Sequence, residues 1–368
     1  MTSPSAHHPE TGAITRLLIY RFGQIGDTIA ALPSLWHLRR HFPHAQLTLL
    51  SEIPQGGNAL PPELVLPAEG LIDQHLKYRG GTSIGNLASL AKTILLLRRS
   101  RFDAVAYLLP TIRSERHRKR DAWFFRLVGI KRTLGFDGYP IDPFPRNGKG
   151  ALGIVPHEAD ALLYRLAKSG LPVVPAGEGC MDLQITAAEQ ARADQWFAQH
   201  RGKERAPHGW FAVCSGSKWQ SKQWPAERYL EVGRRLIQEH GLMPVILGGR
   251  EDRDLGERLI AGWGTGLCAA GDLSVRESAA LMRGAKFYLG NDTGVMHLAA
   301  AVGRPCVGVF SALDWPGRWY PYGKGHRVLR FEVPCSGCLL EVCNRRNECL
   351  TGIETDRVFA ACLEVLGS

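Results

Sequence analysis

The segment Phe287-Tyr288-Leu289-Gly290-Asn291-Asp292-Thr293-Gly294 is the most informative about the fold, because it joins an apolar run of strand length to a helical run through a small polar turn. The helical run stops at residues 303–305, where Gly and Pro give the expected punctuation. A strand, a turn and a helix in this order form the repeating unit of a parallel sheet covered by helices. The first turn of such a helix presents unpaired amides and a partial positive charge, so small side chains there leave room for a phosphate group.

Two interpretations of this turn stay open. In the first, the Thr293 hydroxyl and the Gly294 backbone bind a phosphate group, whereas in the second Asp292 or Thr293 only caps the helix. His297 lies one turn further along among apolar neighbours, where packing alone rarely selects an imidazole, and we include it as a candidate donor contact. A single histidine on an apolar face is nevertheless more often a buried structural residue.

The same alternation of apolar runs and helical patterns fills the first 140 residues and begins again near residue 187. Residues 172–179, rich in Pro and Gly, separate the two series and are typical of an interdomain linker. The sequence therefore predicts an α/β protein with two Rossmann-like domains.

The overall composition is consistent with two domains but does not identify the class of binding partner. A chain of 368 residues is too long for one ordinary core, and 45% hydrophobic with 22% charged residues is a normal globular balance. The net charge of +10 favours an anionic partner, which could be nucleic acid, a membrane surface or a phosphorylated small molecule. No apolar run is long enough to span a bilayer and the N-terminus is polar, so we expect a cytoplasmic location.

Two further strand ends in the second half carry polar loops. Residues 214–225 combine a Gly/Ser loop containing Ser217 with two lysines, Lys218 and Lys222, before a helix that starts at a proline. Such a loop offers amides, hydroxyls and ammonium groups at the sheet edge where open α/β sheets bind ligands, although a solvated loop would look the same. Residues 247–252 place Glu251 where it could accept hydrogen bonds from ribose hydroxyls, or simply favour a helix start.

In the first half, residues 21–27 join the first strand to the first helix. They lack the G-x-G-x-x-G spacing of dinucleotide-binding sites, which argues against a dehydrogenase. A carboxylate at this position, Asp27, is placed for general-base chemistry on an acceptor hydroxyl if a phosphate-binding edge faces it. The alternative is that Asp27 only caps the helix.

Four cysteines crowd into residues 335–349 with C-x2-C-x4-C-x5-C spacing; they are Cys335, Cys338, Cys343 and Cys349. Four thiols this close together could hold zinc or iron as a structural site, but the spacing is not that of the common paired C-x2-C zinc pattern. A reduced or disulfide-paired loop is the alternative.

Taken together, these stretches resemble glycosyltransferase family 9, the heptosyltransferases of lipopolysaccharide core assembly. The matching pieces are Gly26-Asp27 with Pro33, Lys222-Gln223-Trp224-Pro225, Leu273-Ser274 before a helix, and Asp292-Thr293-Gly294 with His297. The resemblance implies the GT-B fold, with two Rossmann-like domains facing across a cleft. It implies an acceptor domain at 1–178, a donor domain at 179–352, and a last helix at 353–368 that returns to the first domain.

Carried over residue by residue, the resemblance implies that Asp27 is the catalytic base of an inverting transfer. It implies that Ser217, Lys222 and the turn of Asp292, Thr293 and Gly294 bind the donor diphosphate. Glu251 is then near the ribose and the Leu273 backbone beside the nucleobase. We add Lys218 and His297 as further donor contacts, and Arg21 and Arg113 as contacts of acceptor phosphates.

The implied partners are a nucleotide-diphospho-sugar, ADP-linked heptose in this family, and a phosphorylated glycolipid at the inner face of the cytoplasmic membrane. No cofactor is required for the reaction, since Lys222 and the helix amides can stabilise the leaving group. An enzyme of the same fold could instead act on a protein or another glycolipid.

A basic nucleic-acid or membrane-binding module is the alternative from another class, suggested by the basic run at residues 113–120. This run lacks the interleaved aromatic residues of nucleic-acid sites, so we expect no nucleic-acid partner.

Overall fold

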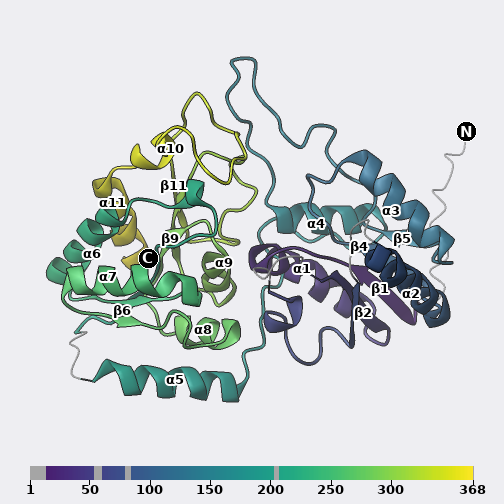
Figure 1. Cartoon of the computed structure of the whole chain (residues 1–368), viewed down its shortest axis with the longest axis horizontal. Coiled ribbons are helices and arrows are strands. Elements are labelled where there is room, and N and C mark those ends of the chain that lie inside the picture. Colours follow the sequence, from purple (N-terminus) through teal and green to yellow (C-terminus); the bar gives the residue numbers. More distant parts are fainter. Residues whose placement is uncertain (1–13, 54–59, 79–83, 203–206, 368) are drawn as a thin grey trace, which may run out of the picture. The chain divides into compact units, whose positions relative to one another are not determined.

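The computed structural model describes residues 14–53, 60–78, 84–202 and 207–367, and the chain divides into two compact units (Figure 1). The first unit contains a five-stranded parallel sheet in the order β3-β2-β1-β4-β5. Its strands are β1 Arg16–Tyr20, β2 Gln46–Glu52, β3 Gln74–Tyr78, β4 Ala104–Tyr107 and β5 Arg132–Leu134. Its helices are α1 Ile25–His41, α2 Ile84–Ser100, α3 Glu115–Leu127 and α4 Glu158–Lys168, with the short turn η1 Pro62–Leu64.

The second unit contains a six-stranded parallel sheet in the order β11-β10-β9-β6-β7-β8. Its strands are β6 Trp210–Cys214, β7 Met243–Ile246, β8 Leu267–Cys268, β9 Tyr288–Asn291, β10 Cys306–Phe310 and β11 Arg327–Arg330. Its helices are α5 Ala187–Arg201, α6 Ala226–His240, α7 Arg253–Trp263, α8 Val275–Met282, α9 Gly294–Ala301, α10 Glu348–Thr351 and α11 Thr355–Leu366, with the turns η2 Gln220–Lys222 and η3 Arg250–Asp252.

Both sheets have the strand order of doubly wound nucleotide-binding folds, counted from the first strand of each unit. The central strands are buried on both faces, as in β1, where Leu17, Leu18 and Ile19 are fully buried. Two of the four edge strands, β3 and β11, carry charged residues and lack a clear apolar pattern, so the sequence did not predict them. The prediction of two Rossmann-like α/β domains is confirmed.

Helix starts follow from capping. A capping box places Glu277 against Ser274 at the start of α8. Ser114 caps α3 and accepts a hydrogen bond from the His117 amide, so this helix begins at Glu115.

The division between the units differs from the expected boundary near residue 178. The first unit ends at Cys180, but it leaves out Phe144–His157, which belong to the second unit. Hydrogen bonds explain this, since the Trp315 indole donates to the Pro145 carbonyl (2.7 Å) and the Val155 amide to the Pro316 carbonyl (2.9 Å).

The last helix also differs from expectation. Helix α11 packs against α6, β10 and β11, and its residues Val358, Phe359 and Cys362 belong to the core of the second unit. Helix α11 therefore belongs to the second unit, which corrects the expected packing of residues 353–368 on the first domain. None of the helices in the described part of the chain is long and apolar enough to cross a membrane.

Candidate donor and acceptor sites

The second unit has its topological switch point between β6 and β9, where the strand order reverses. Open α/β sheets bind ligands in the crevice at the carboxyl ends of the strands that flank such a point. Cys214 at the end of β6 pairs with Gly290 near the end of β9, so the loops that follow the two strands lie side by side. These loops are the 214–225 stretch and the 287–294 stretch that the sequence singled out.

Lys222 and Asp292 meet at this edge. The Lys222 ammonium lies 2.6 Å from the Asp292 carboxylate, and their side chains are 19% and 11% exposed. The Trp219 ring covers the ammonium from 5.1 Å. A cation is thus held in a half-buried position beside the start of α9, where a phosphate group would also find helix amides.

Asn291, which no sequence argument selected, organises both loops. Its side chain is fully buried, and its amide group donates to the Ser215 carbonyl (2.7 Å). Its side-chain oxygen accepts from the Trp224 amide (3.2 Å) and from the Tyr229 hydroxyl (2.8 Å). A polar residue at the end of a buried strand was the signal that could have found it.

The structure at the start of α9 shows whether Asp292 or Thr293 caps this helix. Thr293 is the N-cap residue, but its side chain makes no capping hydrogen bond, and the Asp292 carboxylate is paired with Lys222. The Thr293 hydroxyl lies 3.4 Å from the Tyr288 hydroxyl. Side-chain capping therefore does not explain these residues, and the first amides of the helix keep their capacity to bind an anion.

His297 is buried in the second turn of α9. Burial, assisted by the nearby His157 and Lys222, lowers the pKa of His297 to about 3. The imidazole is therefore neutral at physiological pH, so any contact with an anionic donor would be a hydrogen bond.

The remaining predicted donor residues are spread around the same edge. The Ser217 hydroxyl accepts from the Trp219 amide (3.3 Å), whereas Lys218 is exposed. Leu273 is buried and precedes the N-cap of α8. Glu251 is exposed in η3.

Asp252, the neighbour of Glu251, turns inward instead. It accepts from the Gly249 amide (2.9 Å), and a Cβ added to Gly216 would lie 1.8 Å from its carboxylate. Burial raises the pKa of Asp252. Within this stretch, Asp252 and not the exposed Glu251 is the carboxylate that lies against the 214–225 loop.

In the first unit, the switch point lies between β1 and β4. Asp27 is the third residue of α1 and accepts from the Gln24 amide (2.8 Å) in a capping box. The Arg21 guanidinium is buried 3.7 Å from the Asp27 carboxylate and donates to the Leu108 carbonyl (3.1 Å). Asp27 therefore caps the helix, and it also keeps 21% of its side chain exposed, as a base that meets a substrate requires.

Arg113 follows β4 at the same edge. It pairs with the buried Asp121 at 3.1 Å and lies over the Phe22 ring. Arg21 and Arg113 thus emerge from the two strands of the switch point, and each already has a carboxylate partner.

Comparison with known proteins identifies the family. The family model "Glycosyltransferase family 9 (heptosyltransferase)" matches residues 166–348, which contain the polar loops after β6, β7 and β9. The chain belongs to glycosyltransferase family 9.

Relatives of this family 9 chain include lipopolysaccharide heptosyltransferase 2 of Escherichia coli, 30% identical over 154 residues, or 40% of this chain and 42% of the relative. Lipopolysaccharide core heptosyltransferase OpsX of Haemophilus influenzae is 23% identical over 87% of this chain and 85% of its own length. The first three curated relatives are matched over only 35–42% of their length.

The solved structure of E. coli heptosyltransferase WaaC with ADP-2-deoxy-2-fluoro heptose has a TM-score of 0.62 at 19% identity, covering 95% of this chain and 99% of that one. This likeness confirms the expected GT-B class of fold.

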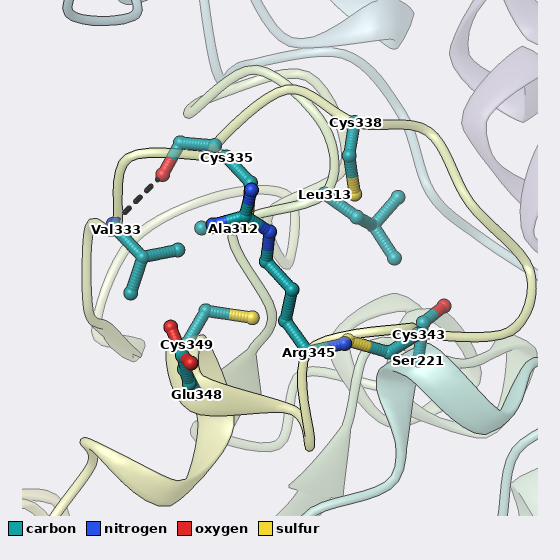
Figure 2. Close-up of a pocket in the computed structure, with 11 residues that line it drawn as sticks. Ser221, Ala312, Leu313, Val333, Cys335, Cys338, Cys343, Arg345, Glu348 and Cys349 are labelled. Carbon is teal, nitrogen blue, oxygen red and sulfur yellow. Dashed lines mark hydrogen bonds between the residues drawn. The ribbon is translucent and has the colours of Figure 1, made fainter.

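The four cysteines of the family 9 chain line one small pocket (Figure 2). Ala312, Leu313 and Val333 form much of the remaining wall. All nine cysteines are free thiols, so a disulfide-paired loop is not what the structure shows. Within the described ranges, no three His, Cys, Asp or Glu side chains are already arranged to hold a metal ion.

Proposed function

We propose that this chain is an inverting heptosyltransferase that moves heptose from ADP-heptose to a lipopolysaccharide-core or related glycan. Membership in family 9 and the lipopolysaccharide heptosyltransferases among its relatives support the reaction and the acceptor class. WaaC in complex with an ADP-heptose analogue supports the donor. The observation that carries the proposal is the half-buried Lys222 held beside the α9 amino terminus at the switch point.

In the proposed reaction, the nucleoside diphosphate leaves as the acceptor oxygen attacks the anomeric carbon from the opposite face. Lys222 and the first amides of α9 stabilise the negative charge that grows on the leaving diphosphate, because a cation and helix amides lie together at this edge. Asp27 removes the proton of the acceptor hydroxyl, a contribution of roughly 10²- to 10⁴-fold to the rate. Arg21 and Arg113 bind acceptor phosphates close to this base.

The proposal is tested by supplying purified protein with ADP-, UDP-, GDP- and CMP-linked sugars and a lipopolysaccharide-core acceptor lacking heptose. We expect transfer with ADP-heptose, detected as a mass increase of the acceptor. Transfer to a protein or another glycolipid, with none to the core acceptor, would favour the alternative enzyme of the same fold. No binding of any nucleotide sugar would refute the proposal.

We also propose that helix α3 brings the enzyme to the inner face of the cytoplasmic membrane. Arg116 and Lys119 are exposed on this helix, as are Trp123 (63%) and Leu127 (48%). Exposed basic residues next to a large aromatic side chain are typical of a surface that binds anionic lipid headgroups.

Vesicle sedimentation tests this step. Vesicles with anionic phospholipid should bind the protein more strongly than neutral ones, and Trp123→Ala should weaken that binding while leaving ADP binding intact. Equal binding to both vesicle types, or salt-dependent binding to DNA without vesicle binding, would contradict it.

A further inference from the structure

The loop that carries the four cysteines is held in an unusual backbone conformation. Among the described residues only five non-glycine positions have positive φ, and Leu339, Arg346 and Asn347 in this loop are three of them. Gly337, between the first two cysteines, has a φ of +82°. Left-handed backbone costs free energy outside glycine, so these turns persist only where other interactions favour them.

The pocket that these turns enclose suits a soft metal ion. Apart from the thiols, much of its wall is apolar, and thiolate ligands in such surroundings are typical of zinc and iron sites. The Arg345 amide donates to the Cys343 sulfur (3.3 Å), a contact that stabilises negative charge on sulfur. Figure 2 shows the Arg345 side chain extending through the pocket, so a cationic group already lies among the thiols.

We propose that this pocket binds one zinc or iron ion through the four cysteine thiolates, and that the ion fixes the turn that carries Lys222. Binding releases the four thiol protons to solvent. Binding requires the four thiols to turn about their side-chain torsions toward one point and the exposed Arg345 side chain to withdraw toward solvent.

The second half of the inference rests on hydrogen bonds between the cysteine loop and η2. The Ser221 amide donates to the Glu341 carbonyl (3.1 Å), and its hydroxyl donates to the Leu340 carbonyl (2.5 Å). The Cys343 amide donates to the Gln220 side-chain oxygen (2.9 Å). Ser221 itself lines the pocket. The loop is thus bonded to the residues immediately before Lys222.

This coupling depends on the proposed role of Lys222 in binding the donor diphosphate. An ion that orders the cysteine loop also orders η2, so Lys222 would meet the diphosphate without losing further freedom. Loss of the ion should therefore weaken nucleotide binding without touching any residue that contacts the nucleotide.

The first measurement is the metal content of the full chain, purified without chelator and determined by plasma mass spectrometry. We expect about one zinc or iron per chain, with the element identified by the same measurement. Cys338→Ser and Cys343→Ser should lose the metal, whereas Cys180→Ser, a half-buried cysteine of the first unit, should keep it. Protein without stoichiometric metal, or Cys338→Ser with wild-type metal content, would overturn the site.

The second measurement is ADP binding by calorimetry on the same proteins. Metal loss should weaken ADP binding by about tenfold, within the usual range for coupling between two sites. Chelation of the wild-type protein should have the same effect and re-addition of metal should reverse it, which keeps the test valid if a cysteine variant folds poorly. Unchanged ADP affinity after metal loss would refute the coupling, whereas metal-loaded wild-type protein that binds no ADP would refute the proposed function instead.

Discussion

Replacement of Lys222 by Met tests the donor site most directly. The ammonium lies 2.6 Å from the Asp292 carboxylate, and neither side chain is more than 19% exposed. Hydrogen bonds to charged groups in such places contribute about 1.5–3 kcal/mol. If Lys222 gives the same interaction to a bound diphosphate, its loss should weaken ADP binding by about 10- to 100-fold.

Lys222→Met alone would combine a loss of ADP affinity with a loss of stability, because it also leaves the Asp292 carboxylate without its cation. We expect this variant to lose about 1–3 kcal/mol of unfolding free energy in addition to its loss of ADP affinity. The double variant Lys222→Met/Asp292→Asn removes both charges, so its stability should return toward the wild-type value. Its ADP affinity should remain low, because no cation is left to meet the diphosphate.

Calorimetry with ADP and urea unfolding of the four proteins in this cycle separate stability from binding. Lys218→Met is the matched control, since Lys218 lies in the same loop but is exposed. We expect it to change ADP affinity less than threefold, as befits an exposed charge worth about 0–1 kcal/mol. A double variant that binds ADP as tightly as the wild-type protein would refute the assignment of Lys222 to the diphosphate.

Three further predictions concern Asp27, Asn291 and His297. Asp27→Asn keeps an oxygen for the Gln24 amide, so ADP affinity should hold while turnover falls about 10²- to 10⁴-fold; unchanged turnover would remove Asp27 from the mechanism. Asn291→Leu leaves buried partners such as the Ser215 carbonyl unpaired and should cost about 3 kcal/mol in urea unfolding, against almost nothing for an exposed control, Asn344→Leu. The pKa of His297 is lowered to about 3 in the folded protein. Below about pH 6.5 the His297 imidazole is therefore protonated in the unfolded chain but stays neutral in the folded chain. Stability should therefore fall as pH drops from about 6.5 toward 3, by about 2 kcal/mol between pH 6.5 and 5, and His297→Gln should flatten this slope. Parallel slopes in the two proteins would contradict the burial argument.

The meeting of the 214–225 and 287–294 loops could be predicted from the sequence, because each loop directly follows a strand end. In a parallel sheet all carboxyl ends lie at one edge, so a polar loop after β6 and another after β9 must share that edge. Lys222 and Asp292 lie 70 residues apart, yet their meeting follows from two local patterns and one topological rule. The edge strands β3 and β11 lacked such a pattern and were missed.

Asn291 and Asp252 could not be selected in the same way. Asn291 matters because its side chain reaches the Ser215 carbonyl and the Trp224 amide, contacts set by how two distant loops pack. Asp252 lies against Gly216 only because η3 turns its carboxylate inward and leaves Glu251 exposed. Neither orientation is encoded by composition or spacing, so both required the three-dimensional arrangement.

On the proposed function, a carboxylate beside the turn that binds the diphosphate is at first sight a disadvantage, since Asp292 competes with the donor for Lys222. A free lysine side chain, however, loses up to about 2 kcal/mol of conformational entropy when it is ordered. The 2.6 Å pair with Asp292 orders Lys222 before the donor arrives. After transfer, the nucleoside diphosphate carries about one more negative charge than the donor did, because its terminal phosphate is no longer esterified. The Asp292 carboxylate repels this product more strongly than the donor and recaptures Lys222 as the product leaves. On the proposed function, the Lys222–Asp292 pair therefore trades a little donor affinity for a preordered cation and faster product release.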